Sequence, residues 1–411
     1  MADAPSTLAG EGRGGGFSDA EWERRRRAVD QLCADQRLDV IVVFGTSANA
    51  RQGQAQIHFL TGFLGHQDAY VVWKPGGDPM LFVQYFNHVP HAQRVARAEV
   101  RWGGTHSVDA VADELAAMPP TLRVGLVGSV PYVEQQRLIG RLGDRTFVDA
   151  TADFLRLRLV KSEEELEWMT RAAAITDQAL DALVGAAVPG ITELELQAEA
   201  SAAAIRAGGQ PHFLYLSSTP MANPDRIVPQ QDLTNRRLQP GDAIILELSA
   251  AYTAYSGQVL RTVTVEAELT ETYRRLHDVA WQAFHEVART IAPGISVAAV
   301  VEAASLIDAQ GLTICDDLVH GYGGGYLPPL LRTPRTSHGL VPDFVFERNM
   351  TLVIQPNVVT TDLRAGVQVG ELVRVTDGGV VSLHRIAQRL LQGGEQAPTL
   401  PSPASGGGEW T

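Results

Sequence analysis

A repeated pattern in the second half of the chain limits the possible folds more than any other feature. A helical segment ending at VPGIT (188–192) precedes a second one that ends at Gly208, and a helical segment ending at APGIS (292–296) precedes one that ends at Gly311. Strand-like runs follow each pair of helical segments. The two copies predict a domain built from a duplicated helix-helix-sheet unit with a shared core.

Polar side chains occur on the strand-like runs of both copies. The first copy contains IILELSA, with Glu247, and QVLRTVTVEA, which begins at Gln258. The second contains TLVIQPNVV, with Gln355, and ELVRVTDGG, which begins at Glu371. If the two halves pair, the ends of four strands meet, and the sequence then predicts one central pocket with contributions from both halves.

The sequence before residue 160 predicts a smaller, separate α/β domain. LDVIVVF, AYVVWK, PMLFVQY and RVGLVGSV are typical of short buried strands, and Ser162 with Glu165 makes a capping box that begins a long helix after them. The ends of the chain are rich in Gly, Pro, Ser and Ala, which is typical of flexible tails. We therefore expect an α+β protein with a tail at 1–16, domains at 17–159 and 160–392, and a second tail at 393–411.

Composition and charge exclude several classes of partner. The net charge of -13 argues against a phosphate-binding basic surface, so nucleic acid and anionic membranes are not expected partners. Apolar runs fall short of the roughly 18 residues that a membrane helix needs. Cys33 and Cys315 fit no paired metal or redox spacing, which favours thiols in a reducing compartment. A small-molecule substrate and a cytoplasmic location are expected.

Several linked motifs resemble the pita-bread family, peptidase family M24, which includes creatinase, prolidase, methionine aminopeptidase and Xaa-Pro aminopeptidase. They are IHFLTGF, KSEEELEWM, LQPGDAIILELSAAYTAYSGQVLRT, VHGYGGG, and TLVIQP with GVQVGELVRVT, in that order over residues 18–390. The resemblance implies a pita-bread C-terminal domain, a creatinase-like N-terminal domain and a homodimer.

The resemblance also assigns the family's metal-ligand positions, and most of them carry another side chain here. It places the two ligating aspartates at Glu247 and Gln258, the ligating histidine at His320, and two late glutamates at Gln355 and Gly370. A neutral amide offers one carbonyl oxygen and no charge to offset the desolvation of a divalent cation. This pattern implies a degenerate site, and we expect no metal and no cofactor.

The departures from the family extend to its catalytic side chains. The resemblance places a second histidine of the peptidases at Leu327 and the catalytic base of creatinase at Gln230. The combination favours a metal-independent, creatinase-like enzyme that hydrolyses a C–N bond of a small polar metabolite. In this hypothesis His320 is the general acid or base, because imidazole titrates near neutral pH, and Glu247 and Glu371 are supporting carboxylates.

Other side chains are candidates for substrate contact. Gln258 and Gln355 can each donate and accept, although they could equally fill the structural place of a metal by hydrogen-bonding Glu247. The loop with His66 is similar to one that reaches the partner's pocket in dimeric family members. The full set of candidates is Gln258, Gln355, Gln230, Tyr322, Tyr326, His212 and His66.

Three other functions remain open on the sequence alone. The pocket could serve a non-hydrolytic lyase, isomerase or cyclase that needs only proton transfer. It could belong to an Xaa-Pro peptidase-like metallohydrolase with an altered site made by Glu247, His320 and Glu371. It could also belong to a catalytically silent binding protein, which explains the missing groups most simply.

Overall fold

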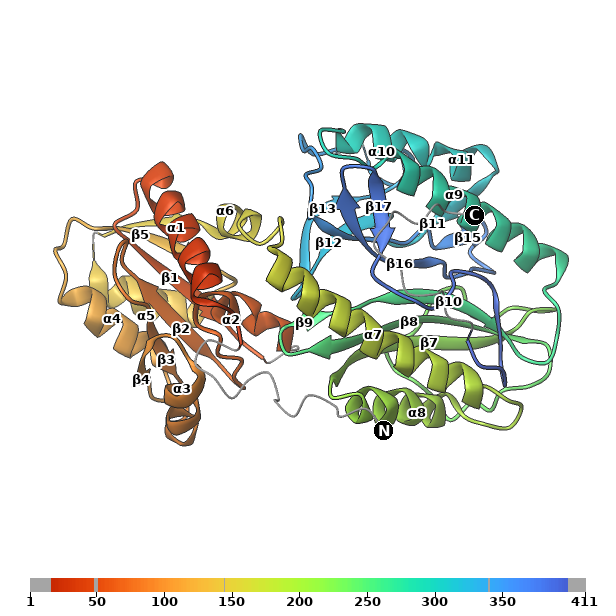
Figure 1. Cartoon of the computed structure of the whole chain (residues 1–411), viewed down its shortest axis with the longest axis horizontal. Coiled ribbons are helices and arrows are strands. Elements are labelled where there is room, and N and C mark those ends of the chain that lie inside the picture. Colours follow the sequence, from red (N-terminus) through yellow and green to blue (C-terminus); the bar gives the residue numbers. More distant parts are fainter. Residues whose placement is uncertain (1–15, 48–50, 144, 339–340, 398–411) are drawn as a thin grey trace. The chain divides into compact units, whose positions relative to one another are not determined.

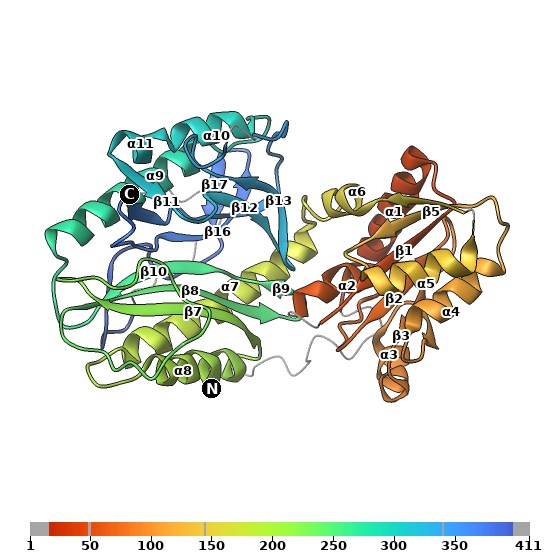
Figure 2. The same cartoon turned by 180° about the vertical axis from the view of Figure 1, so that it is seen from behind.

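The chain divides into two compact units in a computed structural model (Figure 1, Figure 2). The first unit ends at Arg158 and the second begins at Leu159. The structure describes residues 16–47, 51–143, 145–338 and 341–397. Most of the two tails expected at 1–16 and 393–411 lies outside these residues. Within them, no helix is long and apolar enough to cross a membrane.

The first unit is a six-stranded sheet between two layers of helices. The strand order is β4-β3-β2-β1-β5-β6, in which β1 is antiparallel to β2 and parallel to β5. Helices α1, α2, α3 and α6 supply one core, and α4 and α5 supply the other. The strands are β1 (Val40–Gly45), β2 (Ala69–Trp73), β3 (Met80–Val83), β4 (Glu99–Trp102), β5 (Arg123–Val127) and β6 (Thr146–Asp149), and the helices are α1 (Asp19–Gln36), α2 (Ala55–Thr61), α3 (Val89–Val95), α4 (Ser107–Ala116), α5 (Tyr132–Leu142) and α6 (Thr151–Arg156).

The second unit is a large sheet with helices from both copies of the repeat (Figure 1). The strand order is β13-β12-β14-β16-β10-β8-β7, with β17, β18 and β9 paired beside this path and β11 paired with β15. The helices are α7 (Glu163–Ala186), α8 (Glu193–Arg206), α9 (Glu271–Thr290), α10 (Val297–Ala303) and α11 (Ser305–Ala309). The strands are β7 (Gln210–Pro220), β8 (Asp242–Tyr252), β9 (Tyr255–Ser256), β10 (Val259–Thr264), β11 (Leu312–Ile314), β12 (Val319–Tyr322), β13 (Tyr326–Leu331), β14 (Thr351–Ile354), β15 (Val358–Thr360), β16 (Gly370–Thr376), β17 (Gly379–Ser382) and β18 (Leu391–Gln392).

The duplication is visible in the connections between helices. Gly190 and Gly294 have φ of 95° and 83°, a conformation that glycine adopts without strain, and each turns the chain into the next helix. Thr192 then caps α8 reciprocally with Glu195, whereas Ser296 makes no side-chain cap on α10. The α+β class and the duplicated helix-helix-sheet unit are confirmed, with the difference that the last helix of the second copy is split into α10 and α11.

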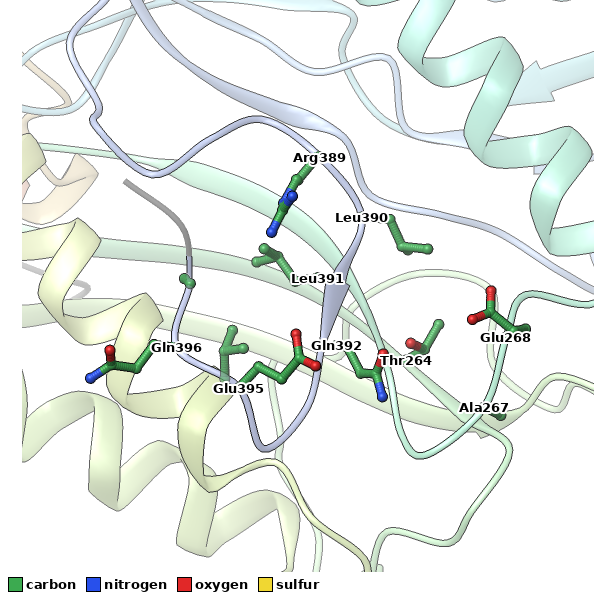
Figure 3. Close-up of a pocket in the computed structure, with 11 residues that line it drawn as sticks. Thr264, Ala267, Glu268, Arg389, Leu390, Leu391, Gln392, Glu395 and Gln396 are labelled. Carbon is green, nitrogen blue, oxygen red and sulfur yellow. The ribbon is translucent and has the colours of Figure 1, made fainter. Parts of the chain in front are cut away.

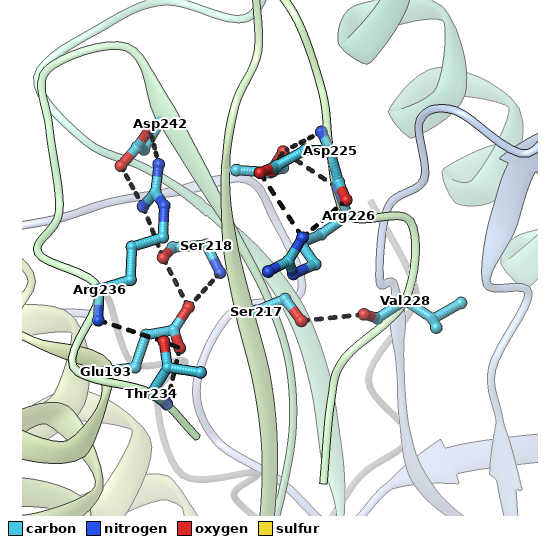
Figure 4. Close-up of polar contacts among 10 residues, drawn as sticks. Glu193, Ser217, Ser218, Asp225, Arg226, Val228, Thr234, Arg236 and Asp242 are labelled. Atoms are coloured by element: carbon cyan, nitrogen blue, oxygen red, sulfur yellow. Dashed lines mark hydrogen bonds and ion pairs between the residues drawn. The ribbon is translucent and has the colours of Figure 1, made fainter. Parts of the chain in front are cut away.

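The long loop between β7 and β8 is tied to the body of the unit by a buried carboxylate (Figure 4). Glu193, at the start of α8, accepts hydrogen bonds from the backbone N–H and hydroxyl of Ser218 at 2.9 and 2.7 Å, and from those of Thr234 at 3.0 and 2.7 Å. Arg236 then donates to Ser218 Oγ at 2.6 Å and to both carboxylate oxygens of Asp242 at 2.7 and 2.8 Å. One connected network therefore fixes both ends of the loop.

We expect Glu193→Ala to lower the free energy of unfolding by about 3 kcal/mol, because the buried N–H and hydroxyl of Ser218 and the part-buried N–H of Thr234 lose their acceptor. Chemical denaturation measures this loss. The matched control is Glu199→Ala on the exposed face of the same helix, which should stay within about 0.5 kcal/mol of the wild type. Equal stability of the two variants would show that the loop is held by other contacts.

Candidate functional site

Four polar side chains meet on one face of the sheet of the second unit, and we call Glu247, Gln258, His320 and Gln355 the central cluster. Gln258 Nε2 donates to Glu247 Oε1 at 2.6 Å and lies 3.4 Å from Gln355 Oε1. His320 pairs with Val353, two residues before Gln355, so the two side chains share a face. The pairing of strands from both copies therefore brings together four of the side chains selected from the sequence.

The central cluster is deeply buried. Glu247 is 5% exposed, and Gln258, His320 and Gln355 are fully buried. Burial raises the pKa of Glu247 to about 8, and the nearby Asp316 and Asp317 act in the same direction. Burial lowers the pKa of His320 to about 4. Both groups therefore favour their uncharged forms at neutral pH.

Three atoms of the central cluster have no hydrogen-bond partner among the described residues. They are Gln258 Oε1, His320 Nε2 and Gln355 Nε2. The other ring nitrogen of His320, Nδ1, lies 3.1 Å from Gly321 O, which leaves Nε2 as the acceptor of the neutral ring. Buried polar atoms without partners are rare in native proteins, and each calls for an explanation such as a catalytic role or a bound water, ion or ligand.

Glu371 does not reach the central cluster. Its carboxylate accepts a 2.6 Å hydrogen bond from Arg261 Nη2, and both side chains are 2% exposed. Glu371 pairs with Val259, one position from the Leu260 that pairs with Glu247, so alternation puts Glu371 on the opposite face of the sheet. The supporting role that the sequence suggested for Glu371 is therefore corrected to an ion pair behind the site.

The two tyrosines proposed from the sequence occupy different positions. Tyr326 stacks on the His320 ring with centroids 4.0 Å apart and remains 46% exposed, so it covers the central cluster from the solvent side. Tyr322 is fully buried, and its hydroxyl lies 3.1 Å from Ser249 Oγ. Tyr326 is thus placed to contact a ligand of the central cluster, whereas Tyr322 packs edge-on against the His320 ring with centroids 5.5 Å apart.

The other candidates lie outside the central cluster. Gln230 is an exposed residue of the β7–β8 loop, where its backbone bridges to Leu216. His212 lines a small cavity of about 90 Å³ with residues of α7 and α8, and burial lowers its pKa to about 4. His66 is exposed in the first unit. Among the described residues of the second unit, neither Gln230 nor His212 contacts the central cluster.

A further cavity of about 140 Å³ lies beside the C-terminal segment (Figure 3). Its lining includes Val184, Thr264, Arg389, Gln392 and Glu395. None of its lining residues belongs to the central cluster, so this cavity is separate from the candidate site.

The donor set of the central cluster does not fit a divalent metal centre. No group of three or more His, Cys, Asp or Glu side chains within the described residues could hold a metal ion. At Gly370, an added Cβ would lie 2.4 Å from Ile354 O and 3.0 Å from Gln355 Cβ, so no side chain fits there without a backbone shift. Of the positions assigned to metal ligands, only Glu247 and His320 keep a strong donor.

Comparison with known proteins identifies relatives of both units. Residues 167–377 match metallopeptidase family M24, and residues 25–160 match the creatinase/prolidase N-terminal domain. The Xaa-Pro dipeptidase of Pyrococcus furiosus is 24% identical over 274 residues, which cover 66% of this chain and 76% of the relative. The probable dipeptidase PepE of Mycobacterium tuberculosis is 25% identical over 268 residues, covering 64% of this chain and 68% of the relative.

Solved structures of similar proteins share the fold. The prolidase from Pyrococcus horikoshii superposes with a TM-score of 0.76 at 18% identity, covering 89% of this chain and 99% of that one. The dipeptidase PepE from Mycobacterium ulcerans superposes with a TM-score of 0.75 at 21% identity, covering 93% and 99%.

The relatives correct the leading functional hypothesis drawn from the sequence. A metal-independent, creatinase-like hydrolase of a small metabolite conflicts with a family of metallopeptidases whose curated members here are Xaa-Pro dipeptidases. That hypothesis gave the missing ligands more weight than the ancestry of the whole domain, and it is wrong. The match to family M24 covers more than half of the chain. The chain therefore belongs to metallopeptidase family M24, with the pita-bread fold in its second unit and a creatinase/prolidase-type domain before it.

Proposed function

We propose that this protein is an Xaa-Pro dipeptidase-like hydrolase with an altered centre, which acts on small peptides at the central cluster. The observation that carries the proposal is the set of three buried, unpartnered polar atoms on Gln258, His320 and Gln355. Apolar residues would fill a site that had lost its ligand, because each unpaired buried polar atom costs stability. The curated relatives named Xaa-Pro dipeptidase indicate the class of ligand.

The protonation states of the central cluster suit an uncharged peptide bond. Below pH of about 8 the Glu247 carboxyl keeps its proton, and above pH of about 4 the His320 ring is neutral. Glu247 can then donate a hydrogen bond to a carbonyl oxygen, and His320 Nε2 can accept a proton.

Turnover of Xaa-Pro dipeptides tests the proposal. Release of proline from Ala-Pro should be detectable with the purified protein, and both Glu247→Gln and His320→Gln should lower kcat/KM by about 100-fold or more, as loss of a general acid or base does. Gln230→Ala is the control, because this exposed residue lies outside the central cluster, and it should keep the wild-type rate. No proline release under any condition, including added Mn²⁺, Co²⁺ or Zn²⁺, would refute hydrolysis.

A second candidate function is a peptide-binding protein without turnover. The observation that favours it is the replacement of strong ligands by Gln258 and Gln355 at an otherwise polar site. Calorimetry with Ala-Pro distinguishes the two functions, since a binding protein would show saturable binding with intact dipeptide recovered after prolonged incubation.

We expect Gln258→Asp combined with Gln355→Glu to bind Mn²⁺ at least about tenfold more tightly than the wild type, because two anionic oxygen donors join Glu247 and His320. Metal content after dialysis at a series of free Mn²⁺ concentrations measures this change. Gln230→Glu adds a distant carboxylate as the control. An unchanged affinity in the double variant would show that the backbone of the central cluster no longer presents ligand geometry.

The raised pKa of Glu247 predicts a pH-dependent stability. Between the ordinary pKa of 4.5 and about 8, the folded state holds a proton that the unfolded state has released. Stability then falls as pH rises, by up to about 1.4 kcal/mol per pH unit for one proton. We expect denaturation between pH 5 and 8 to show this fall in the wild type and in the control Glu199→Gln, and a flatter profile in Glu247→Gln. Parallel profiles for all three proteins would place the pKa of Glu247 outside this window.

We further propose a homodimer in a reducing, cytoplasmic compartment. The thiols of Cys33 and Cys315 are free, and burial raises the pKa of Cys33 to about 12, which keeps it unreactive. The dimer rests on the family resemblance, and light scattering of the purified chain measures it directly.

A further inference from the structure

A second pair of buried amides adjoins the central cluster. Asn357 is 1% exposed and Gln368 is 2% exposed. Neither Asn357 Nδ2 nor Asn357 Oδ1 has a hydrogen-bond partner in the part of the chain that the structure describes, and the same holds for Gln368 Oε1. The sequence did not single out either residue. A buried carboxamide with both its donor and its acceptor unpaired is unfavourable unless a ligand or an ordered water satisfies it.

The backbone places Asn357 beside the central cluster and opposite Gln368. The N–H of Asn357 donates to Gln355 O at 2.7 Å, so a tight turn joins the two amide residues. Beyond the turn, Val359 bridges to Gly366, and the N–H of Val367 donates to Val358 O at 3.0 Å. Continuing this antiparallel register by one residue sets position 357 opposite position 368.

Gln368 is held by the strand that also carries part of the central cluster. Its N–H donates to Thr262 Oγ1 at 2.9 Å, and Thr262 Oγ1 donates to Gln368 O at 3.1 Å. Thr262 lies two residues along β10 from Leu260, which pairs with Glu247. Gln368 therefore lies beside Thr262, about 7 Å along β10 from the residue that pairs with Glu247.

The β7–β8 loop contacts the segment that joins β15 to β16. An added Cβ at Gly366, two residues from Gln368, would lie 2.1 Å from Ile227 O. The Glu193 network holds this loop in place. Because Asn357 follows Gln355 by two residues, it has the position of a subsite for a group attached to the one that the central cluster binds.

We propose that Asn357 and Gln368 form an amide-recognition site that binds a carboxamide or backbone amide of the peptide substrate. The inference rests on the proposed action on small peptides. A carboxamide offers an N–H to Asn357 Oδ1 and a C=O to Asn357 Nδ2, so both free atoms are satisfied at once. A carboxylate offers acceptors only and leaves Oδ1 without a donor. Asn357 is therefore a specificity-determining residue that favours an amidated or longer peptide over a free dipeptide acid.

Paired ligands test the inference. Ala-Pro and Ala-Pro-amide differ only in the terminal group, and Kd and kcat/KM are measured for both with the full chain. The wild type should favour the amide by about tenfold, which is the worth of one or two neutral hydrogen bonds. Asn357→Asp should increase this preference, because the new carboxylate still accepts from the ligand amide N–H and repels a ligand carboxylate.

Asn357→Leu provides a variant without a buried charge. It should abolish the preference for the amide, and its Tm should equal or exceed that of the wild type, because it removes two unpaired polar atoms from the interior. A clearly lower Tm together with an unchanged ligand ratio would identify Asn357 as structural and overturn the inference.

The remaining outcomes separate the inference from the proposed function. Hydrolysis or binding of both ligands with equal affinity, unchanged in the two Asn357 variants, would overturn the inference and leave the proposed function intact; amides that hold only water would behave in this way. Absence of both binding and turnover for the two ligands would overturn the inference and the proposed function together.

Discussion

The pairing of β10 with β16 is the contact on which the second unit depends, because it joins the two copies of the repeat. Val259 pairs with Glu371 and Leu260 with Gly370 in this register, and the N–H of Leu372 donates to Gln258 O at 3.0 Å. On one face the register sets Arg261 against Glu371, a buried pair whose disruption would cost about 3–5 kcal/mol. On the other face it brings Glu247 of β8 and Gln258, next to β10, close to Gln355, which follows β14. A slip of one residue would exchange the two faces and dissolve the central cluster.

The same register places the Arg261–Glu371 ion pair and the uncharged central cluster on opposite faces of the sheet. The buried guanidinium and carboxylate are matched behind the sheet, whereas the central cluster favours uncharged forms of Glu247 and His320. A family site that holds a divalent cation concentrates anionic ligands. In the central cluster, Glu247 is the one carboxylate, and it favours its protonated form. Neutral donors and acceptors remain, and they are suited to reading the dipoles of peptide groups rather than to holding an ion.

Local rules predicted much of the fold from the sequence. The capping box of Ser162 and Glu165 forms as its side-chain types require, and the glycines of the two repeated PGI turns adopt positive φ. The meeting of Glu247, Gln258 and Gln355 also followed from pairing the two copies. The face of Glu371 could not be fixed, because strand ends shift by a residue and each shift reverses a side chain. Asn357 was missed because its signal is the lack of a buried partner, which only packing reveals.

The packing around Gly370 excludes a side chain at this position. The backbone of β14 closes on the position that the family resemblance assigns to a ligating glutamate, with Ile354 O and Gln355 occupying the volume a Cβ would need. Restoring a carboxylate at that position therefore demands a prior change in the neighbouring strand. Restoring the family's full set of metal ligands would therefore need coordinated substitutions on two strands, at position 370 and next to β14.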